Sequence, residues 1–226
     1  MATWVITGGN RGIGLELVES LLAEGNKVIA GMRNPEDFTL EHANLTTLYL
    51  DVKDTNSANE FGAKIASITD TVDVLVNNAG MMDGRWQSFE DVDMEQSLEV
   101  LNVNTIGPMR VTQSLWPIMK STPNARVAMI TSLMGSIDDC MSGRSYAYRT
   151  SKTGLNMITK VLSIEGRDHD ITVTCYHPGW VKTDMGGQMA PVTKAESVEG
   201  LMSLINNQTM EKSGRFFEYT GVEFPW

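Results

Sequence analysis

A tyrosine and a lysine four positions apart, in the stretch YAYRTSK (residues 146–152), are the residues that point most directly to chemistry. Residues four apart lie on one face of a helix, so Tyr148 and Lys152 can reach into the same cleft. A free phenol has a pKa of about 10, and a neighbouring ammonium favours the phenolate and lowers that value. Such a phenol can give a proton to a carbonyl oxygen while a hydride arrives from a nicotinamide. The alternative is an ordinary exposed helix turn.

A glycine-rich segment, TGGNRGIG (Thr7–Gly14), follows a short apolar run and precedes a helical pattern. Glycines here allow a tight turn and let a pyrophosphate approach the backbone, while the N-terminus of the next helix attracts the anion. Gly8, Gly12 and Gly14 are spaced GxxxGxG rather than GxGxxG. The segment predicts a dinucleotide site, with a ligand-free turn as the alternative.

The residues after the second predicted strand bear on the choice between NAD and NADP. A carboxylate there would bind the adenosine ribose and favour NAD, but positions 30–32 carry none and Arg33 follows them. Arg33 and Arg11 could hold a 2′-phosphate through charge-assisted hydrogen bonds. NADP(H) is therefore the predicted cofactor. NAD(H) is the alternative, because Glu36 and Asp37 follow closely and Arg33 could be a solvated surface residue.

Short β-rich runs alternate with helical patterns along the whole chain. The predicted strands cover residues 3–7, 27–32, 46–52, 72–78, 125–132, 171–178 and 214–219. One predicted helix follows the glycine-rich segment, and the others cover residues 57–68, 88–120, 146–167 and 194–206. Ser57–Glu60 matches a capping box, and Ser88–Asp91 could cap the helix that continues to about Lys120. This order predicts a single-domain, Rossmann-type α/β fold over residues 1–226. Its doubly wound parallel sheet would have about seven strands, with helices on both faces.

Composition narrows the possible functions. A net charge of −10 repels phosphate backbones, so no nucleic-acid partner is expected. We find no run of 18 apolar residues and no basic-then-apolar leader, so we expect neither a membrane span nor a secretory signal. Cys140 and Cys175 form no disulfide framework or zinc site, and His42, His169 and His177 lack metal-ligand spacing. No metal is therefore predicted, and a reduced cytoplasm is the expected compartment.

Further motifs, in the right order, make the chain resemble the short-chain dehydrogenase/reductase family from end to end. These are TGxxxGIG (7–14), an aspartate after the third strand (Asp51), NNAG (77–80), NVNTIGP (102–108), Ser-x-x-Gly after the fifth strand (Ser132), YxxxK (148–152) and HPGWVKTDM (177–185). The stretches at residues 134–152 and 214–226 resemble the subgroup of sniffer-type carbonyl reductases and C-factor-like signalling proteins.

The resemblance implies a role for each motif residue. Tyr148 would be the general acid in reduction and the base in oxidation, and Lys152 would hold the nicotinamide ribose and lower the tyrosine pKa. Ser132 would hydrogen-bond the substrate oxygen, and Asn104 would anchor a water that links Lys152 to solvent. As simpler interpretations, Ser132 caps a strand end and Asn104 marks a helix kink. Besides Tyr148 and Lys152, the implied cofactor-binding residues are Gly8, Asn10, Arg11, Gly12, Ile13, Gly14, Arg33, Asp51, Val52, Asn78, Ala79, Gly80, Pro178, Gly179, Val181 and Thr183.

These patterns predict an NADPH-dependent oxidoreductase that reduces small aldehydes or ketones by hydride transfer with a tyrosine general acid. One alternative is a cofactor-binding signalling or regulatory protein of the C-factor type. Another is an NAD-dependent alcohol dehydrogenase. The expected partner is a small carbonyl or alcohol substrate, and the resemblance implies a homodimer or homotetramer formed through the helices around residues 88–120 and 148–167.

The segment after the Pro-Gly turn bears on substrate breadth. Residues 184–194 contain two glycines and a proline, so we expect a short, mobile loop in place of a helical lid. The pocket would then be shallow, with apolar or aromatic walls. The expected wall residues are Met134, Tyr146, Trp180, Met185 and the loop Met81–Trp86.

Overall fold

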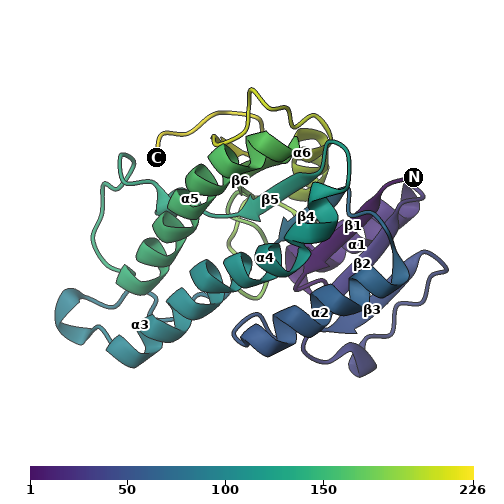
Figure 1. The fold of residues 1–226 in the computed structure, drawn as a ribbon. Coiled ribbons are helices and arrows are strands. Elements are labelled where there is room, and N and C mark those ends of the chain that lie inside the picture. Colours follow the sequence, from purple (N-terminus) through teal and green to yellow (C-terminus); the bar gives the residue numbers. More distant parts are fainter.

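All strands of the computed structural model, which describes residues 1–226, join one parallel sheet in the order β3-β2-β1-β4-β5-β6-β7 (Figure 1). The strands are β1 (Thr3–Thr7), β2 (Lys27–Met32), β3 (Leu45–Tyr49), β4 (Val74–Asn77), β5 (Arg126–Ile130), β6 (Thr172–His177) and β7 (Phe216–Glu218). The strand order reverses between β1 and β4, which pair in parallel. Ligands of open parallel sheets bind at the carboxyl ends of the strands beside such a reversal.

Helices cover both faces of the sheet (Figure 1). They are α1 (Gly12–Ala23), α2 (Thr55–Ile68), α3 (Met94–Leu101), α4 (Gly107–Lys120), α5 (Tyr146–Gly166) and α6 (Lys194–Asn206). Helices α1 and α6 pack on the face that carries Trp4 and Ile6 of β1, whereas α2, α4 and α5 pack on the face that carries Val5. Because both faces are buried, the strands are almost continuously apolar. The predicted fold class is confirmed.

Helices α3 and α4 are joined by a π-helical turn, Asn102–Ile106, so that one bent rod runs from Met94 to Lys120. π-Turns inside helices are frequent at functional sites. Pro108 has no N–H to bond the backbone carbonyl of Asn104 four residues earlier, so an unbroken α-helix is disfavoured here. The turn places the Asn104 side chain in the protein interior.

Two of the predicted helix starts are wrong. Helix α2 begins at Thr55, where the Asp54 side chain accepts a hydrogen bond from the Asn56 N–H at 2.7 Å. Helix α3 begins at Met94, where the Asp93 carboxylate accepts from the Gln96 N–H at 3.0 Å. The predicted caps lie elsewhere: residue 57 is inside α2, and residue 88 precedes a short 3₁₀ turn, Phe89–Asp91.

The segment between β6 and α6 contains no helix, as expected from its glycines and proline. It is held at its ends by an isolated parallel bridge between Val181 and Val192. None of the helices combines the length and the apolar character needed to cross a bilayer.

Candidate active site

Ser132, Tyr148 and Lys152 are brought together by β5 and α5. Ser132 follows β5, and its Oγ accepts a hydrogen bond from the Met134 N–H at 3.1 Å. Tyr148 and Lys152 lie on the buried face of α5. Gly135 lets the turn after β5 pack against α5, because a Cβ on Gly135 would lie 2.9 Å from the backbone carbonyl carbon of Lys152. The turn after β5 and helix α5 therefore supply all three residues of this expected cluster.

The Lys152 ammonium is buried between β5 and the NNAG segment. Its Nζ donates to the Ile130 carbonyl at 2.9 Å and lies 5.8 Å from the centre of the Tyr148 ring. A Cβ on Gly80 would lie 3.7 Å from that Nζ, so Gly80 lines the same space. Burial lowers the pKa of Lys152 to about 8.

The Tyr148 phenol behaves differently from the sequence-based expectation. Burial raises the pKa of Tyr148 to about 12, although the Ser132 hydroxyl and the Arg85 guanidinium favour the phenolate. The expected lowering by Lys152 is not seen, because the effect of burial on the phenol is larger than that of its polar neighbours. The phenol therefore keeps its proton at neutral pH, which is the state that a general acid requires.

Asn104 connects the π-turn to the NNAG segment. Its Nδ2 donates to the Met81 carbonyl at 2.8 Å and to Ser151 Oγ at 3.0 Å, and its Oδ1 accepts from the Met81 N–H at 2.8 Å. An amide oxygen has two lone pairs, so Oδ1 keeps one acceptor position. Asn104 thus fixes the backbone beside Gly80, and its role toward a water stays a prediction.

The glycine-rich segment fits a pyrophosphate. The backbone N–H groups of Gly12, Ile13 and Gly14 open helix α1 and have no acceptor within the protein. Gly8 and Gly12 have φ angles of 68° and 58°, which favour glycine. A Cβ on Gly14 would lie 2.1 Å from the Gly8 carbonyl oxygen, so no larger residue fits the turn. An uncapped helix N-terminus with free N–H groups is a binding site for an anionic phosphate group.

The NNAG segment packs directly on this turn. The hydroxyl of Thr7 accepts from the Asn78 N–H at 3.0 Å and from the Ala79 N–H at 2.9 Å. Asn78 Nδ2 donates to the carbonyls of Thr7 and Gly8. Asn77 instead braces the sheet, because its Nδ2 donates to Thr112 Oγ1 at 3.0 Å.

The segment after β6 closes the opposite side of the turn. A Cβ on Gly12 would lie 3.5 Å from the Thr183 methyl group, so the two segments are in contact. Pro178 accepts a hydrogen bond from Ser197 of α6, Gly179 has a φ of 85°, and Val181 is buried. Of these implied cofactor residues, Thr183 contacts the N-terminus of α1, while Pro178 is bonded to α6.

Residues at the ends of β2 and β3 lie further along the same edge of the sheet. Arg33 directly follows β2 and is exposed, and Asp37 of the following 3₁₀ turn bonds the Asn34 side chain at 3.2 Å. The loop after β3 is fixed by Arg110 of α4, whose Nη1 donates to the Val52 carbonyl at 3.2 Å. At the near end, exposed Asn10 precedes Arg11, which lies 3.7 Å from Asp184.

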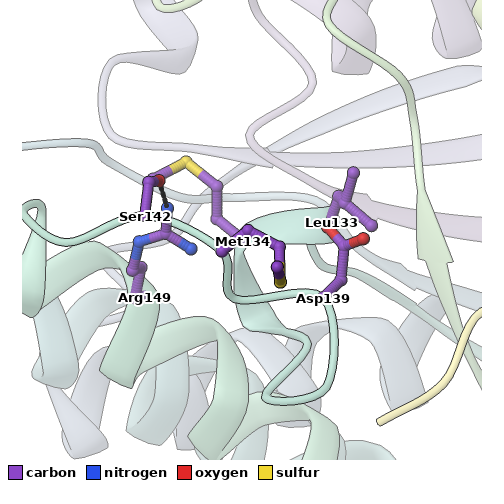
Figure 2. A pocket seen from close by; sticks show the side chains of 6 residues that line it. Leu133, Met134, Asp139, Ser142 and Arg149 are labelled. Carbon is purple, nitrogen blue, oxygen red and sulfur yellow. Dashed lines mark hydrogen bonds between the residues drawn. The ribbon is translucent and has the colours of Figure 1, made fainter.

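The substrate side is formed by three loops. Arg85 Nη1 donates to the Met185 carbonyl at 3.4 Å, and the Arg85 guanidinium lies 5.3 Å from the centre of the Trp86 ring. The Trp86 N–H donates to Ser145 Oγ at 3.3 Å. Tyr146 packs its ring edge-on against another loop residue, Phe89, with centroids 5.7 Å apart. A cavity of about 320 Å³ lies beside Met134, between the turn after β5 and the start of α5 (Figure 2).

Sequence reasoning missed several residues that shape the site. Thr7 is the first residue of the glycine motif and the last of β1, and its hydroxyl could have been recognised as a hydrogen-bond acceptor. Arg85 lies in the loop expected to line the pocket and Arg149 within the YxxxK motif, but no role was assigned to either side chain or to Arg110, and only the folded chain shows what they contact. No three His, Cys, Asp or Glu side chains gather as metal ligands.

Comparison with known proteins defines the class of protein to which this fold and site belong. A profile of the short chain dehydrogenase family matches residues 2–194. The chain belongs to this family of oxidoreductases, and the resemblance seen in its motifs is confirmed.

Solved carbonyl reductases are among the proteins to which the chain is similar. It is similar to the NADPH-bound carbonyl reductase from chicken fatty liver, with 33% identity, a TM-score of 0.93 and coverage of 100% and 99% of the two chains. It is similar to the carbonyl reductase Sniffer of D. melanogaster, with 32% identity, a TM-score of 0.95 and full coverage of both chains. It is also 42% identical to C-signal of Myxococcus xanthus over 158 residues, which are 70% of this chain and 95% of that protein.

Proposed function

We propose that the protein is an NADPH-dependent reductase of small aldehydes and ketones. The observation that carries this proposal is a buried Tyr148 phenol that keeps its proton beside Ser132 and Lys152. These groups lie at the same edge of the sheet as the free N-terminus of α1. The cofactor, when bound, supplies the hydride that the carbonyl carbon accepts.

The remaining steps belong to residues of this chain. The Ser132 hydroxyl orients the carbonyl oxygen, and Tyr148 donates its proton to that oxygen as negative charge develops there. Lys152 is charged at neutral pH, would hold the nicotinamide ribose and would stabilise the phenolate that remains. Asn104 keeps the NNAG backbone in place beside Lys152.

The phosphate-bearing form of the cofactor is supported by the residues after β2. The strand ends at Met32, so the first side chain at the ribose position is that of Arg33. Glu36 and Asp37 lie in the following 3₁₀ turn, where the Asp37 carboxylate accepts a hydrogen bond from the Asn34 side chain. A carbonyl reductase with 33% identity to this chain carries NADPH. Arg33 and Arg11 would hold the 2′-phosphate, and Asp51 and Val52 would hold the adenine.

The substrate class follows from the open side of the cleft. Residues 184–193 form no helix that could close over the cleft, and Trp180 and Met185 are half exposed. Apolar walls discriminate weakly between similar ligands. We therefore expect broad activity on small apolar or aromatic aldehydes and activated ketones. A mixed panel of aldehydes, diketones, quinones and steroids tests this, and a hundredfold preference for one substrate would contradict it.

The central test compares two tyrosines that are two positions apart. Tyr148→Phe removes the proton donor and should lower turnover by about 10²–10⁴-fold, while the dissociation constant for NADPH stays within about threefold. Tyr146→Phe makes the same chemical change in a side chain that faces Phe89, and it should keep turnover. Turnover and NADPH fluorescence titration measure the two effects. Substantial activity in Tyr148→Phe removes that residue from the mechanism.

A second candidate, a cofactor-bound signalling protein, is favoured by the similarity to C-signal. It predicts tight NADP(H) binding with no turnover of any carbonyl on the panel. The presence of Asn104, Ser132, Tyr148 and Lys152 together favours the reductase, since a binding protein has no need of a proton donor.

Assembly and location complete the proposal. Leu98 of α3 and Met157 of α5 are 60% and 63% exposed, and both belong to the helices expected to pair in a homodimer or homotetramer. Leu98→Glu should then convert the wild-type oligomer to monomers in light scattering after size-exclusion chromatography.

Both cysteines are free, which fits a reducing cytoplasm.

A further inference from the structure

The cavity beside Met134 is bounded by the same two segments that carry the proposed catalytic residues (Figure 2). Its lining residues are Leu133, Met134, Asp139, Met141, Ser142 and Arg149. Leu133 and Met134 follow Ser132 directly, and Arg149 follows Tyr148. With a volume of about 320 Å³, the cavity is at the small end of the range of about 300–1,000 Å³ for ligand sites.

Arg149 brings an incompletely used guanidinium to this cavity. Its Nη2 donates to Ser142 Oγ at 3.0 Å, and its Nε is buried with no acceptor. It forms no ion pair with any carboxylate of the chain. Because no carboxylate of the chain neutralises Arg149, an anionic ligand in the cavity would gain an ion pair with the guanidinium. A carboxylate matches a guanidinium best, because it can accept two N–H groups in parallel.

Asp139 brings the opposite charge to the same cavity. It is exposed, and its carboxylate takes part in no ion pair with Arg149 or any other cation. Figure 2 shows the two charged side chains apart, with Met134 between them. A ligand with only a carboxylate would be repelled by Asp139, and one with only an ammonium would be repelled by Arg149. The charges together match a ligand that carries both.

We propose that this cavity is a substrate subsite for an α-amino-acid group, with the carboxylate bound by Arg149 and the ammonium bound by Asp139. The aliphatic or aromatic part of the substrate would lie along Met134, which places its carbonyl toward Ser132 and Tyr148. This inference rests on the proposed reductase function and names a substrate class for it: carbonyl compounds that carry an amino-acid group.

Four probes with the same aryl ketone separate the two charges. They are 4-acetyl-L-phenylalanine, 3-(4-acetylphenyl)propanoate, 2-(4-acetylphenyl)ethylamine and 4-ethylacetophenone. Calorimetric titration into the protein, both alone and with NADP⁺, gives their affinities without turnover. For the wild type we expect the amino acid to bind about tenfold more tightly than the neutral ketone, which is the low end for hydrogen bonds to charged groups.

The variants should act in opposite directions on the singly charged probes. Arg149→Gln should weaken both carboxylate-bearing probes by about tenfold and tighten the amine, because the repelling cation is gone. Asp139→Asn should weaken both ammonium-bearing probes and tighten the propanoate. Arg167→Gln and Asp168→Asn, at the far end of α5, make the same changes in net charge and should alter none of the affinities. Unchanged thermal midpoints verify that each variant is folded.

The same set of measurements separates this inference from the proposed function. NADPH oxidation with 4-ethylbenzaldehyde, which is uncharged, reads the reductase activity alone. If that aldehyde is reduced but the four probes bind equally, or if both variants shift all probes alike, the amino-acid subsite is wrong and the reductase function stands. If the charge preference is found but no carbonyl is reduced, the cavity binds such ligands and the reductase function fails.

Discussion

The glycine turn on the cofactor side of the candidate site leaves no room for a side chain at Gly14, whereas the loop before α5 on the substrate side leaves open space at Gly143. A Cβ on Gly14 would lie 2.1 Å from a carbonyl oxygen, but a Cβ on Gly143 would meet no atom within 4 Å. On the substrate side, three non-glycine residues have left-handed backbones, namely Trp86, Arg144 and Ser145 with φ angles of 67°, 74° and 56°. The glycine turn is thus fixed by close packing, and the substrate-side loops are held in left-handed backbone conformations without glycine.

The largest difference between the two sides is expected when one methyl group is added to a glycine of each. Gly14→Ala forces the Gly8 carbonyl and the Asn78 side chain to move, so NADPH affinity should fall by more than about 100-fold, since a misplaced donor loses its charged hydrogen bond. Gly143→Ala should change neither affinity nor unfolding free energy by more than about 0.5 kcal/mol. Fluorescence titration and urea unfolding measure both. Similar losses in the two variants would contradict the comparison.

A smaller effect on the cofactor side tests the phosphate contact. Arg33→Ala should weaken NADPH binding by about 10–150-fold, because one charged hydrogen bond contributes about 1.5–3 kcal/mol. NADH, which lacks the phosphate, serves as the internal control and should bind nearly as before. Equal weakening of both cofactors would show that Arg33 does not contact the 2′-phosphate.

The pH profile tests the buried lysine that lies between the two sides. The pKa of Lys152 is lowered to about 8, so its ammonium is present below that pH and is lost above it, while Tyr148, with a pKa of about 12, stays protonated. The kcat/KM for NADPH should be level near pH 7 and fall as pH rises through about 8, by up to tenfold per unit. In Lys152→Arg the remaining activity should not fall there, since a guanidinium keeps its charge. A decline at the same pH in this variant would assign it to another group.

The smallest effect is expected in the loop backbone of the substrate side. Arg144→Gly should alter the unfolding free energy by less than about 1 kcal/mol, because relief of the left-handed strain offsets the added chain entropy. Arg144→Val should destabilise by about 1–3 kcal/mol, since a β-branched residue tolerates that conformation poorly. Urea unfolding measures both variants. A stable Val variant would show that the loop is free to change its backbone.

The same contrast explains what could be predicted from the sequence. The strands and the glycine turn were predicted because short apolar runs and obligatory glycines leave a local pattern, and the capping pattern at residues 57–60 located α2 but not its first residue. Its cap was misassigned, since Ser57 accepts a hydrogen bond from the Asp51 N–H at 2.9 Å in the folded chain and Asp54 is left to cap the helix. A capping pattern cannot reveal a partner that the fold supplies.

The properties of the catalytic cluster depend on burial, which no motif encodes. YxxxK placed Tyr148 and Lys152 correctly on one helix face, but the direction of the phenol pKa shift follows from the loss of water around it. The contacts of Arg85 and Arg149 carry no motif either, since Arg85 bonds Met185, 100 positions away, and Arg149 bonds Ser142 of the irregular segment before α5. The motifs predicted that Ser132, Tyr148 and Lys152 lie together, whereas the contacts of the neighbouring arginines required the structure.

The reversal of strand order at β1 also has a consequence for how the chain folds. Strand β1 pairs with β2, its neighbour along the chain, and with β4, and the bond from the Asn78 N–H to Thr7 Oγ1 spans 71 positions. Contacts this distant require closure of a long loop and slow the search for the native pairing. The crevice for the cofactor exists only after that loop has closed. A dinucleotide that binds there therefore stabilises the finished sheet and no earlier species, so NADPH should slow unfolding while leaving the rate of refolding unchanged.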